Sequence, residues 1–320
     1  MRPSDLTGLS RLWARSWLRF WFPTTTVVSL AICRIVLVPA WLLLFAKPWD
    51  QLAVALTYDP ARIDQELILA ILSLIPVETF HSYEFLHSLW LLTNVAGVLA
   101  VVGLFTRTSV LVFGLGHSVL IAHLWSYGEL HHPEALYCVA LVLMGLSPSG
   151  RCYSIDSWIG RRSQHPERWG PDAKIDTATW PLRLVQCLLG IAYFSSGSAK
   201  MLDGGLTWWN GATLQTIVLV DYVRFGMPAG LWLVQNFWLC VAASVVTVIV
   251  ELFFFVAVFV PASRKYVLMG GLALHIGIYL TMAAPFFTWM AMYVIFINFE
   301  KIRQQFVVPQ TAASGESWQV

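Results

Sequence analysis

The chain has 320 residues, of which 58% are hydrophobic and only 12% are charged. A soluble domain carries roughly twice that share of charged residues, because it must cover itself with polar surface. The composition therefore excludes an ordinary soluble protein and indicates a chain covered by membrane lipid. A net charge of +2, with basic residues scattered through the loops, excludes a nucleic-acid partner.

Continuous apolar runs predict membrane helices, because backbone groups in hydrocarbon must be satisfied within a helix or a closed barrel. A span needs about 20 apolar residues. The sequence therefore predicts an all-α integral membrane protein, a polytopic bundle of about eight transmembrane helices. In chain order these spans are Thr26–Ala46, Phe85–Phe105, Ser109–Trp125, Pro133–Leu146, Leu182–Leu202, Leu231–Val260, Tyr266–Ala284 and Phe286–Asn298.

Two further segments are too short or too polar to span comfortably. Leu67–Val77 is short and contains Pro76, and Leu214–Phe225 carries Asp221 and Arg224. They predict one or two short interfacial or re-entrant helices. The run Leu231–Val260 is long enough to predict a tilted or kinked span.

Lysine and arginine residues predict the orientation of the bundle, since basic loops stay cytoplasmic. With eight spans, the basic segments fall on one side: the N-terminal arm, Arg107, the loop from Arg151 to Lys174, the turn Arg264–Lys265 and the tail from Lys301. Both termini are therefore expected in the cytoplasm, in a plasma or inner membrane. Residues 1–25 are expected to form a cytoplasmic amphipathic arm, 26–300 the transmembrane bundle and 301–320 a cytoplasmic tail.

The sequence predicts no metal site. The five cysteines lie mostly inside apolar runs, and none forms a CxxC pair. His131 and His132 follow the short turn that holds Glu129, and neighbours on a helix point about 100 degrees apart, which is poor geometry for a shared metal ion. A hydrogen bond to a substrate, or a structural role, is expected of them instead.

An ionisable residue inside a membrane helix costs about 3 kcal/mol unless it is paired or faces water. Arg34 cannot shed its charge, so it needs an acidic partner or several carbonyl groups. Glu251 is the leading acidic candidate, and a structural charge pair of Arg34 with Glu251 is expected. His275, in the seventh span, either bonds a backbone carbonyl or lines a cavity.

Lys200 lies near the outward end of the fifth span, directly after the small residues Ser195–Ala199. Small residues allow helices to approach closely. Either the long side chain reaches the interface and only marks it, or desolvation favours the neutral amine, which then acts as a base. Trp208 and Trp209 follow, as interface anchors or as a roof over a flat ligand.

The pattern Tyr193-Phe194-x-x-Gly197-x-x-Lys200, followed by Trp209-x-Gly211, resembles the signature helix of the HTTM membrane domain. That domain is shared with vitamin K-dependent gamma-carboxylase. The arginine motif around Arg34, the histidine turn before the fourth span, and Leu274-His275 also resemble the family. The similarity covers residues 20–300.

The resemblance implies that Lys200 is the base that deprotonates reduced vitamin K, a menaquinol or a similar quinol. It implies His132, or His131, as a hydrogen-bonding partner near the quinone. The implied pocket residues are His275, Tyr193 and Trp209. The sequence departs from the carboxylase where Met201 follows a single lysine, since the carboxylase has two adjacent lysines, and where no large soluble region follows the last helix.

The polar residues and the family resemblance together suggest two alternative functions. The first is a membrane enzyme, a quinol-dependent carboxylase/epoxidase-like lyase or oxidoreductase, which acts at an extracytoplasmic pocket around Lys200. Its expected partners are membrane lipid, a lipid quinone and a peptide or small protein. The alternative is a non-catalytic membrane component for maturation or export of a peptide or small partner protein, in which Lys200 only anchors its helix. A transporter is less supported, because no inverted repeat is visible.

Overall fold

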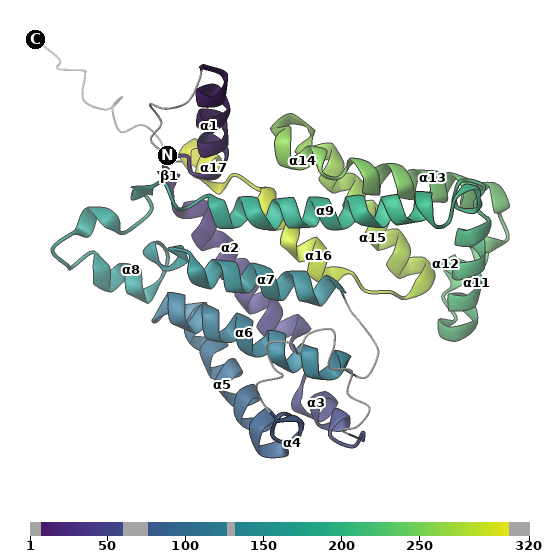
Figure 1. Ribbon diagram of the computed structural model, residues 1–320, viewed down its shortest axis with the longest axis horizontal. Helices are drawn as coiled ribbons and strands as arrows, with labels where there is room; N and C mark the ends of the chain where they lie inside the picture. The colour runs from purple at the N-terminus through teal and green to yellow at the C-terminus, as the bar shows by residue number, and fades with distance from the viewer. Residues whose placement is uncertain (1–7, 60–75, 127–131, 307–320) are drawn as a thin grey trace, which may run out of the picture.

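The computed structural model describes residues 8–59, 76–126 and 132–306, and helices dominate them (Figure 1). The predicted all-α class is confirmed. The longer helices are α1 (Gly8–Trp21), α2 (Val28–Ala40), α5 (Tyr83–Val102), α6 (Thr106–Trp125), α7 (His132–Leu146), α9 (Trp180–Leu202), α11 (Ala212–Phe225), α13 (Phe237–Phe253) and α15 (Arg264–Met282). The shorter ones are η2 (Trp41–Phe45), α3 (Trp49–Ala55), α4 (Val77–Phe80), η5 (Ser149–Arg151), α8 (Ile155–Gly160), η6 (Pro166–Arg168), α10 (Leu206–Trp209), α12 (Pro228–Val234), α14 (Val256–Phe259), η7 (Pro261–Ser263), α16 (Phe287–Met292), η8 (Tyr293–Phe296) and α17 (Phe299–Phe306).

Four helical segments of the described chain are long and apolar enough to cross a membrane: Val28–Phe45, Tyr83–Val102, Thr106–Trp125 and Pro261–Met282. A fifth results if α12 and α13 are counted as one broken span. The helix α9 has 23 residues, but Arg183, Gln186 and Lys200 make it less apolar. The predicted spans at α7 and at α16–η8 are apolar but short. The structure therefore supports a membrane bundle without confirming a count of eight.

The run Leu231–Val260, which predicts a tilted or kinked span, is divided into separate helices. The chain breaks at Gln235 and Asn236, and α12 meets α13 at 103°. Asn236 donates a side-chain hydrogen bond of 2.7 Å to the Trp232 carbonyl, which satisfies an acceptor that the broken helix leaves open. α11 and α12 run across the ends of α9 and α13 (Figure 1), as expected of interfacial segments. Most of the predicted segment Leu67–Val77 lies outside the described residues.

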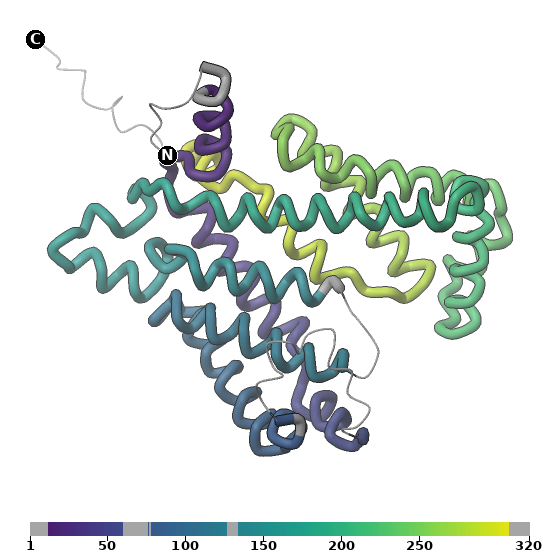
Figure 2. Tube along the Cα trace, viewed as in Figure 1, coloured from purple at the N-terminus to yellow at the C-terminus, as the bar shows by residue number. Residues whose placement is uncertain are grey.

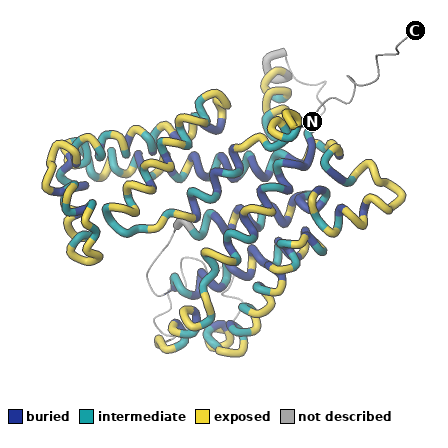
Figure 3. The backbone as a smooth tube through the Cα atoms, turned by 180° about the vertical axis from the view of Figure 1, so that it is seen from behind, coloured by how far each residue is buried: buried dark blue, intermediate teal, exposed yellow. Residues whose placement is uncertain are grey.

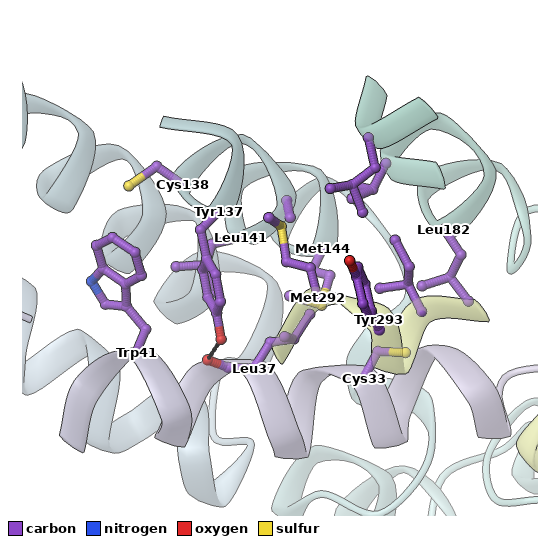
Figure 4. Packing of buried hydrophobic residues seen from close by; sticks show 14 of the residues in the cluster. Cys33, Leu37, Trp41, Tyr137, Cys138, Leu141, Met144, Leu182, Met292 and Tyr293 are labelled. Carbon is purple, nitrogen blue, oxygen red and sulfur yellow. Dashed lines mark hydrogen bonds between the residues drawn. The ribbon is translucent and has the colours of Figure 1, made fainter. Parts of the chain in front are cut away.

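The helices pack in two groups. α6 lies between α5 and α7, while α9 packs against α13, and α13 against α15. The helix α2 crosses between the groups, together with α16 and η8 (Figures 1 and 2). In the core, Tyr137 of α7 donates a hydrogen bond of 2.8 Å to the Leu37 carbonyl of α2, beside the buried Trp41 ring (Figure 4).

Buried residues lie along the middle of the molecule, and the outer faces of the peripheral helices are exposed (Figure 3). On α5 these exposed side chains are apolar, for example Leu92, Val95 and Val98, each more than half exposed. An apolar outer face of this kind suits contact with lipid rather than with water.

Three segments that are distant in sequence meet at one end of the molecule. The strands β1 (Thr25–Thr26) and β2 (Lys174–Ile175) pair antiparallel. Arg303 of α17 donates a hydrogen bond of 2.8 Å to Asp172 in the loop after α8. The N-terminal arm, the basic loop and the C-terminal helix therefore share one end, as the distribution of basic residues predicts. The assignment of that end to the cytoplasm stays a prediction.

Candidate functional site

Lys200 is held inside the bundle by two oxygen acceptors. Its Nζ donates a hydrogen bond of 2.8 Å to Ser196 Oγ, one turn earlier on α9, and another of 2.8 Å to Glu251 Oε1 on α13. The Lys200 side chain is 19% exposed and that of Glu251 is 9% exposed. The amine therefore does not extend freely to the lipid headgroups, because an ion pair between two helices holds it.

Close approach of α9 and α13 makes this ion pair possible. A Cβ atom on Gly197 would lie 3.0 Å from both the Glu251 Cβ and the backbone nitrogen of Leu252. A side chain there would separate the helices. Gly197 therefore allows the two helices to pack closely, as the run of small residues before Lys200 predicts.

The indole of Trp208 covers Lys200. The Lys200 Nζ lies 5.2 Å from the centroid of the Trp208 ring, which is within the range of a cation–π contact. Ser244 of α13 donates a hydrogen bond to the Trp208 carbonyl, which holds α10 against the bundle. Trp208 rather than the expected Trp209 therefore provides the aromatic contact with the amine.

The spacing Trp209-x-Gly211 reflects the turn from α10 into α11. Gly211 has a φ of +77°, and a Cβ atom there would lie 2.6 Å from the backbone nitrogen of Val241. Only glycine fits both the left-handed conformation and this approach to α13. The second part of the sequence pattern thus shapes the wall beside Lys200.

A buried polar network lies on the same face of α9, about two turns from Lys200. Tyr193 Oη is hydrogen-bonded to His275 Nε2 of α15 and to Tyr293 Oη of η8. The Tyr193 ring stacks on Phe254, with 3.8 Å between ring centroids. The structure thus gives His275 a phenol partner, where the sequence predicts a carbonyl or a cavity.

The network retains an open hydrogen-bonding position. His275 is 4% exposed, and its Nδ1 is buried with no hydrogen-bond partner among the described residues. The second oxygen of Glu251, Oε2, is also buried and has no hydrogen-bond partner among the described residues. Each of these atoms can accept or donate one more bond from a bound molecule.

A pocket of about 480 Å³ lies where η2, α7 and the start of α16 meet. Lys47 Nζ lies 2.9 Å from Glu134 Oε1 in its wall. Glu134 Oε2 and Thr288 Oγ1 are buried and have no hydrogen-bond partner among the described residues. An apolar hollow with a few open polar atoms is typical of a small-molecule site. Its lining residues are Leu44, Phe45, Lys47, Glu134, Pro285, Phe287 and Thr288.

One short segment joins this pocket to the Tyr193 network. Pro285, Phe287 and Thr288 line the pocket, while Phe286 stacks on His275 at 4.9 Å between centroids. Trp289 packs against Tyr193, also at 4.9 Å. A ligand in the pocket would therefore press on a segment that contacts the buried histidine and tyrosine.

The structure brings together only part of the expected site. Lys200 and Tyr193 share one face of α9, and His275 bonds Tyr193, but Lys200 is not among the residues that line the 480 Å³ pocket. His132 begins α7, at the pocket end of that helix, and its side chain is not described; His131 lies outside the described residues.

Sequence reasoning missed Lys47, Thr288 and Tyr293 as site residues. Each is an ordinary residue at a helix end or beside a turn, so no pattern singles it out. Glu134 carries a stronger signal, since it is an acidic residue at the start of an apolar span. The sequence does not show that Glu134 lines a pocket, because the pocket forms only where α16 packs against α7.

The expected charge pair of Arg34 with Glu251 is wrong. Arg34 is fully buried, and it donates hydrogen bonds to the carbonyls of Ala100 at 2.8 Å and Tyr153 at 2.5 Å. Ala100 belongs to the last turn of α5, whose carbonyls lack partners within the helix and carry partial negative charge. Of the two environments that the sequence allows for Arg34, an acidic partner or several carbonyl groups, the structure has the carbonyl groups. Glu251 pairs with Lys200 instead.

Comparison with known proteins gives one match. The family model described as the HTTM domain matches residues 22–301. No curated protein and no solved structure matches the chain. Within the described residues, no group of three histidine, cysteine, aspartate or glutamate side chains is arranged to hold a metal ion.

Proposed function

The chain belongs to the HTTM domain family, and from this membership we propose that it is a vitamin K-dependent gamma-carboxylase-like membrane enzyme that acts with a lipid quinol. Lys200 serves as its base. The observation that carries the proposal is the Lys200 amine, which lies inside the bundle at 2.8 Å from both Glu251 and Ser196. A base needs this shielding from water and a partner that takes up its proton.

The residues at this end of the bundle suit a quinol. The Trp208 ring, 5.2 Å from the Lys200 Nζ, offers a contact to a flat ring beside the amine, and the buried Glu251 Oε2 has a position open to an oxygen substituent. A quinol dissolves in lipid, so it can reach a pocket between membrane helices. When bound, it supplies an acidic hydroxyl and the electrons for oxygen chemistry.

The protein's own part in the reaction is proton transfer. Glu251 Oε1 accepts a proton from Lys200 Nζ, which leaves the amine with a free electron pair. The amine then accepts one proton from an acidic hydroxyl, and the pair ends as an ammonium group beside a neutral carboxylic acid. Ser196 Oγ keeps the amine oriented toward Glu251 throughout. The Tyr193 and His275 network orients the neighbouring segment Pro285–Trp289.

Purified protein supplied with reduced quinol tests this assignment. Lys200→Ala should abolish quinol consumption, and Glu251→Gln should lower the rate by about 10²-fold to 10⁴-fold, the usual share of a general base. Lys265→Ala, at an exposed lysine of α15, is the matched control and should keep the full rate. A folded Lys200→Ala protein with wild-type quinol turnover would contradict the proposal.

A second function is favoured by one observation: the Lys200–Glu251 pair also fastens α9 to α13. In that case the chain is a non-catalytic membrane component for the maturation or export of a peptide or small partner protein. Wild-type protein that binds no quinone in lipid extracts, but copurifies with a small protein partner, would support this second function and exclude the first.

A further inference from the structure

A second pocket, of about 310 Å³, lies at the opposite end of α9 from Lys200. Arg183 and Lys200 are 17 positions apart on this helix, which corresponds to about 25 Å at 1.5 Å per residue. We call it the arginine pocket. Its polar lining residues include Thr25, Thr26, Ser29, Thr179, Arg183 and Arg264.

The two guanidinium groups of the arginine pocket have neutral partners only. Arg183 donates to Gln186 Oε1 at 3.0 Å, and Arg264 Nε donates to the Ala257 carbonyl at 2.9 Å. Neither forms a salt bridge with a described residue, and their positive charges repel each other. The Arg183 Nε is buried without a hydrogen-bond partner among the described residues. Two partly buried like charges without an anion are costly.

The backbone adds to this positive potential. The helices α2 and α9 begin at Val28 and Trp180, so two helix N-termini border the pocket. Each N-terminus carries unpaired N–H groups and a partial positive charge. The two helix ends and the two guanidinium groups therefore favour the same kind of ligand, an anion.

The position of the pocket indicates where that anion comes from. Two of its helices belong to candidate membrane spans, and the pocket lies where these spans, Val28–Phe45 and Pro261–Met282, begin. The end of a membrane span lies near the lipid headgroups. The helix α1 lies at the same end (Figures 1 and 3); its Phe20 ring lies 4.9 Å from the Arg183 guanidinium, and its Trp13 and Trp17 are exposed. Exposed tryptophans are typical of the membrane interface.

We propose that the arginine pocket binds a phosphate group, either in the headgroup of a membrane phospholipid or as free phosphate. Arginine forms paired hydrogen bonds with phosphate oxygens. The hydroxyl groups of Thr25, Thr179 and Ser29 provide further polar contacts in the wall. The site is independent of the proposed quinol chemistry, since it lies at the other end of α9.

Binding to the delipidated, full-length protein in neutral detergent tests this site. Phosphatidylglycerol and inorganic phosphate are titrated separately at constant ionic strength, and bound lipid is counted by native mass spectrometry. Arg183→Gln and Arg264→Gln should each weaken binding of the effective probe at least tenfold. Arg183→Lys keeps the charge and should weaken it less, and Arg168→Gln, at an exposed arginine, should have no effect.

The probes separate the two sources of phosphate. Binding of phosphatidylglycerol that millimolar phosphate does not displace identifies a lipid headgroup, while saturable binding of inorganic phosphate alone identifies a site for the free ion. If the glutamine variants do not fold, labelling of wild-type arginines by phenylglyoxal replaces them, and the effective probe should protect Arg183 and Arg264. The proposal is overturned if the pocket variants bind like Arg168→Gln, or if neither probe protects these arginines.

Discussion

Lys200 and Glu251 form a mostly buried ion pair, which bears on stability and on the proposed proton transfer. Removing water from a charged group costs several kcal/mol, and a partner in good geometry offsets that cost. Here the Lys200 Nζ has two oxygen acceptors at 2.8 Å, and Glu251 Oε2 remains open. The pair is therefore stable as it stands, and one carboxylate oxygen remains open to a hydrogen bond.

A double-mutant cycle measures how strongly this pair is coupled. Lys200→Met and Glu251→Gln should each lower the free energy of unfolding in detergent, because each leaves a mostly buried partner alone. The double variant should lose less than the sum, with a coupling energy of about 1–3 kcal/mol. The same cycle on the exposed pair His165 and Glu167 is the control and should give a coupling near zero. If the coupling energy of Lys200 with Glu251 equals that of His165 with Glu167, burial does not strengthen the Lys200–Glu251 ion pair.

At the scale of the element, contact between α9 and α13 decides whether the site can form. The contact depends on a position without a side chain, Gly197, which faces the Glu251 Cβ and the Leu252 backbone. The break between α12 and α13 also contributes, because it lets α11 and α12 turn across the end of α9. The helix ends, and not the spans alone, thus shape the surroundings of Lys200.

Gly197→Leu tests that contact. The new side chain should force α9 and α13 apart and lower the free energy of unfolding by about 1–3 kcal/mol, as overpacking usually does. Gly277→Leu is the matched control, because nothing lies within 4 Å of a Cβ atom built on Gly277 in α15. Thermal unfolding in detergent compares the two. Equal melting temperatures for both variants would show that the glycine at position 197 is not required for packing.

At the scale of the whole molecule, the two ends of the described chain are tied together away from the bundle core. Thr26 of β1 donates a hydrogen bond of 2.6 Å to Glu300 of α17, and Arg303 joins α17 to Asp172. This tie closes the end of the molecule that holds the arginine pocket. The proposed quinol site and the proposed phosphate site therefore lie at opposite ends of one scaffold.

Acid should loosen this tie. Burial alone would raise the pKa of Glu300, but hydrogen bonds from Thr26, Arg303 and Gln304 hold that pKa below its ordinary value of 4.5. A lowered pKa means that the carboxylate stabilises the fold fully above about pH 4.5 and that this contribution is lost as the pH falls further. Hydrogen exchange in α17, corrected for its intrinsic dependence on pH, should become faster below that value.

Glu300→Gln provides the comparison for the acid effect. This variant should already exchange faster in α17 at neutral pH and should show little further change in acid. Glu167→Gln, at an exposed glutamate in the loop after α8, should behave as the wild type does. If all three proteins respond equally to acid, Glu300 does not control the tie.

The sequence by itself determined the class of the protein and the position of its most unusual residue. Charge-poor, apolar runs predict membrane helices, and the described chain has four helices, or five with the bent pair, that are long and apolar enough to cross a membrane. The small residues before Lys200 predict close helix packing there, and Gly197 provides it. Such features are local, because the burial of a helix and the spacing of its faces depend on residues a few positions apart.

Only the tertiary structure decided which polar groups meet. Lys200 and Glu251 are 51 positions apart, and Tyr193 and Tyr293 are 100 apart. The sequence predicts Arg34 as the partner of Glu251, but packing places Arg34 against carbonyl groups and Lys200 beside Glu251. The length of the run Leu231–Val260 predicts a tilted or kinked span, but the 103° bend at Gln235 and Asn236 is defined only by the tertiary structure. A contact between distant segments depends on how whole helices cross, and no periodicity within one helix encodes that crossing.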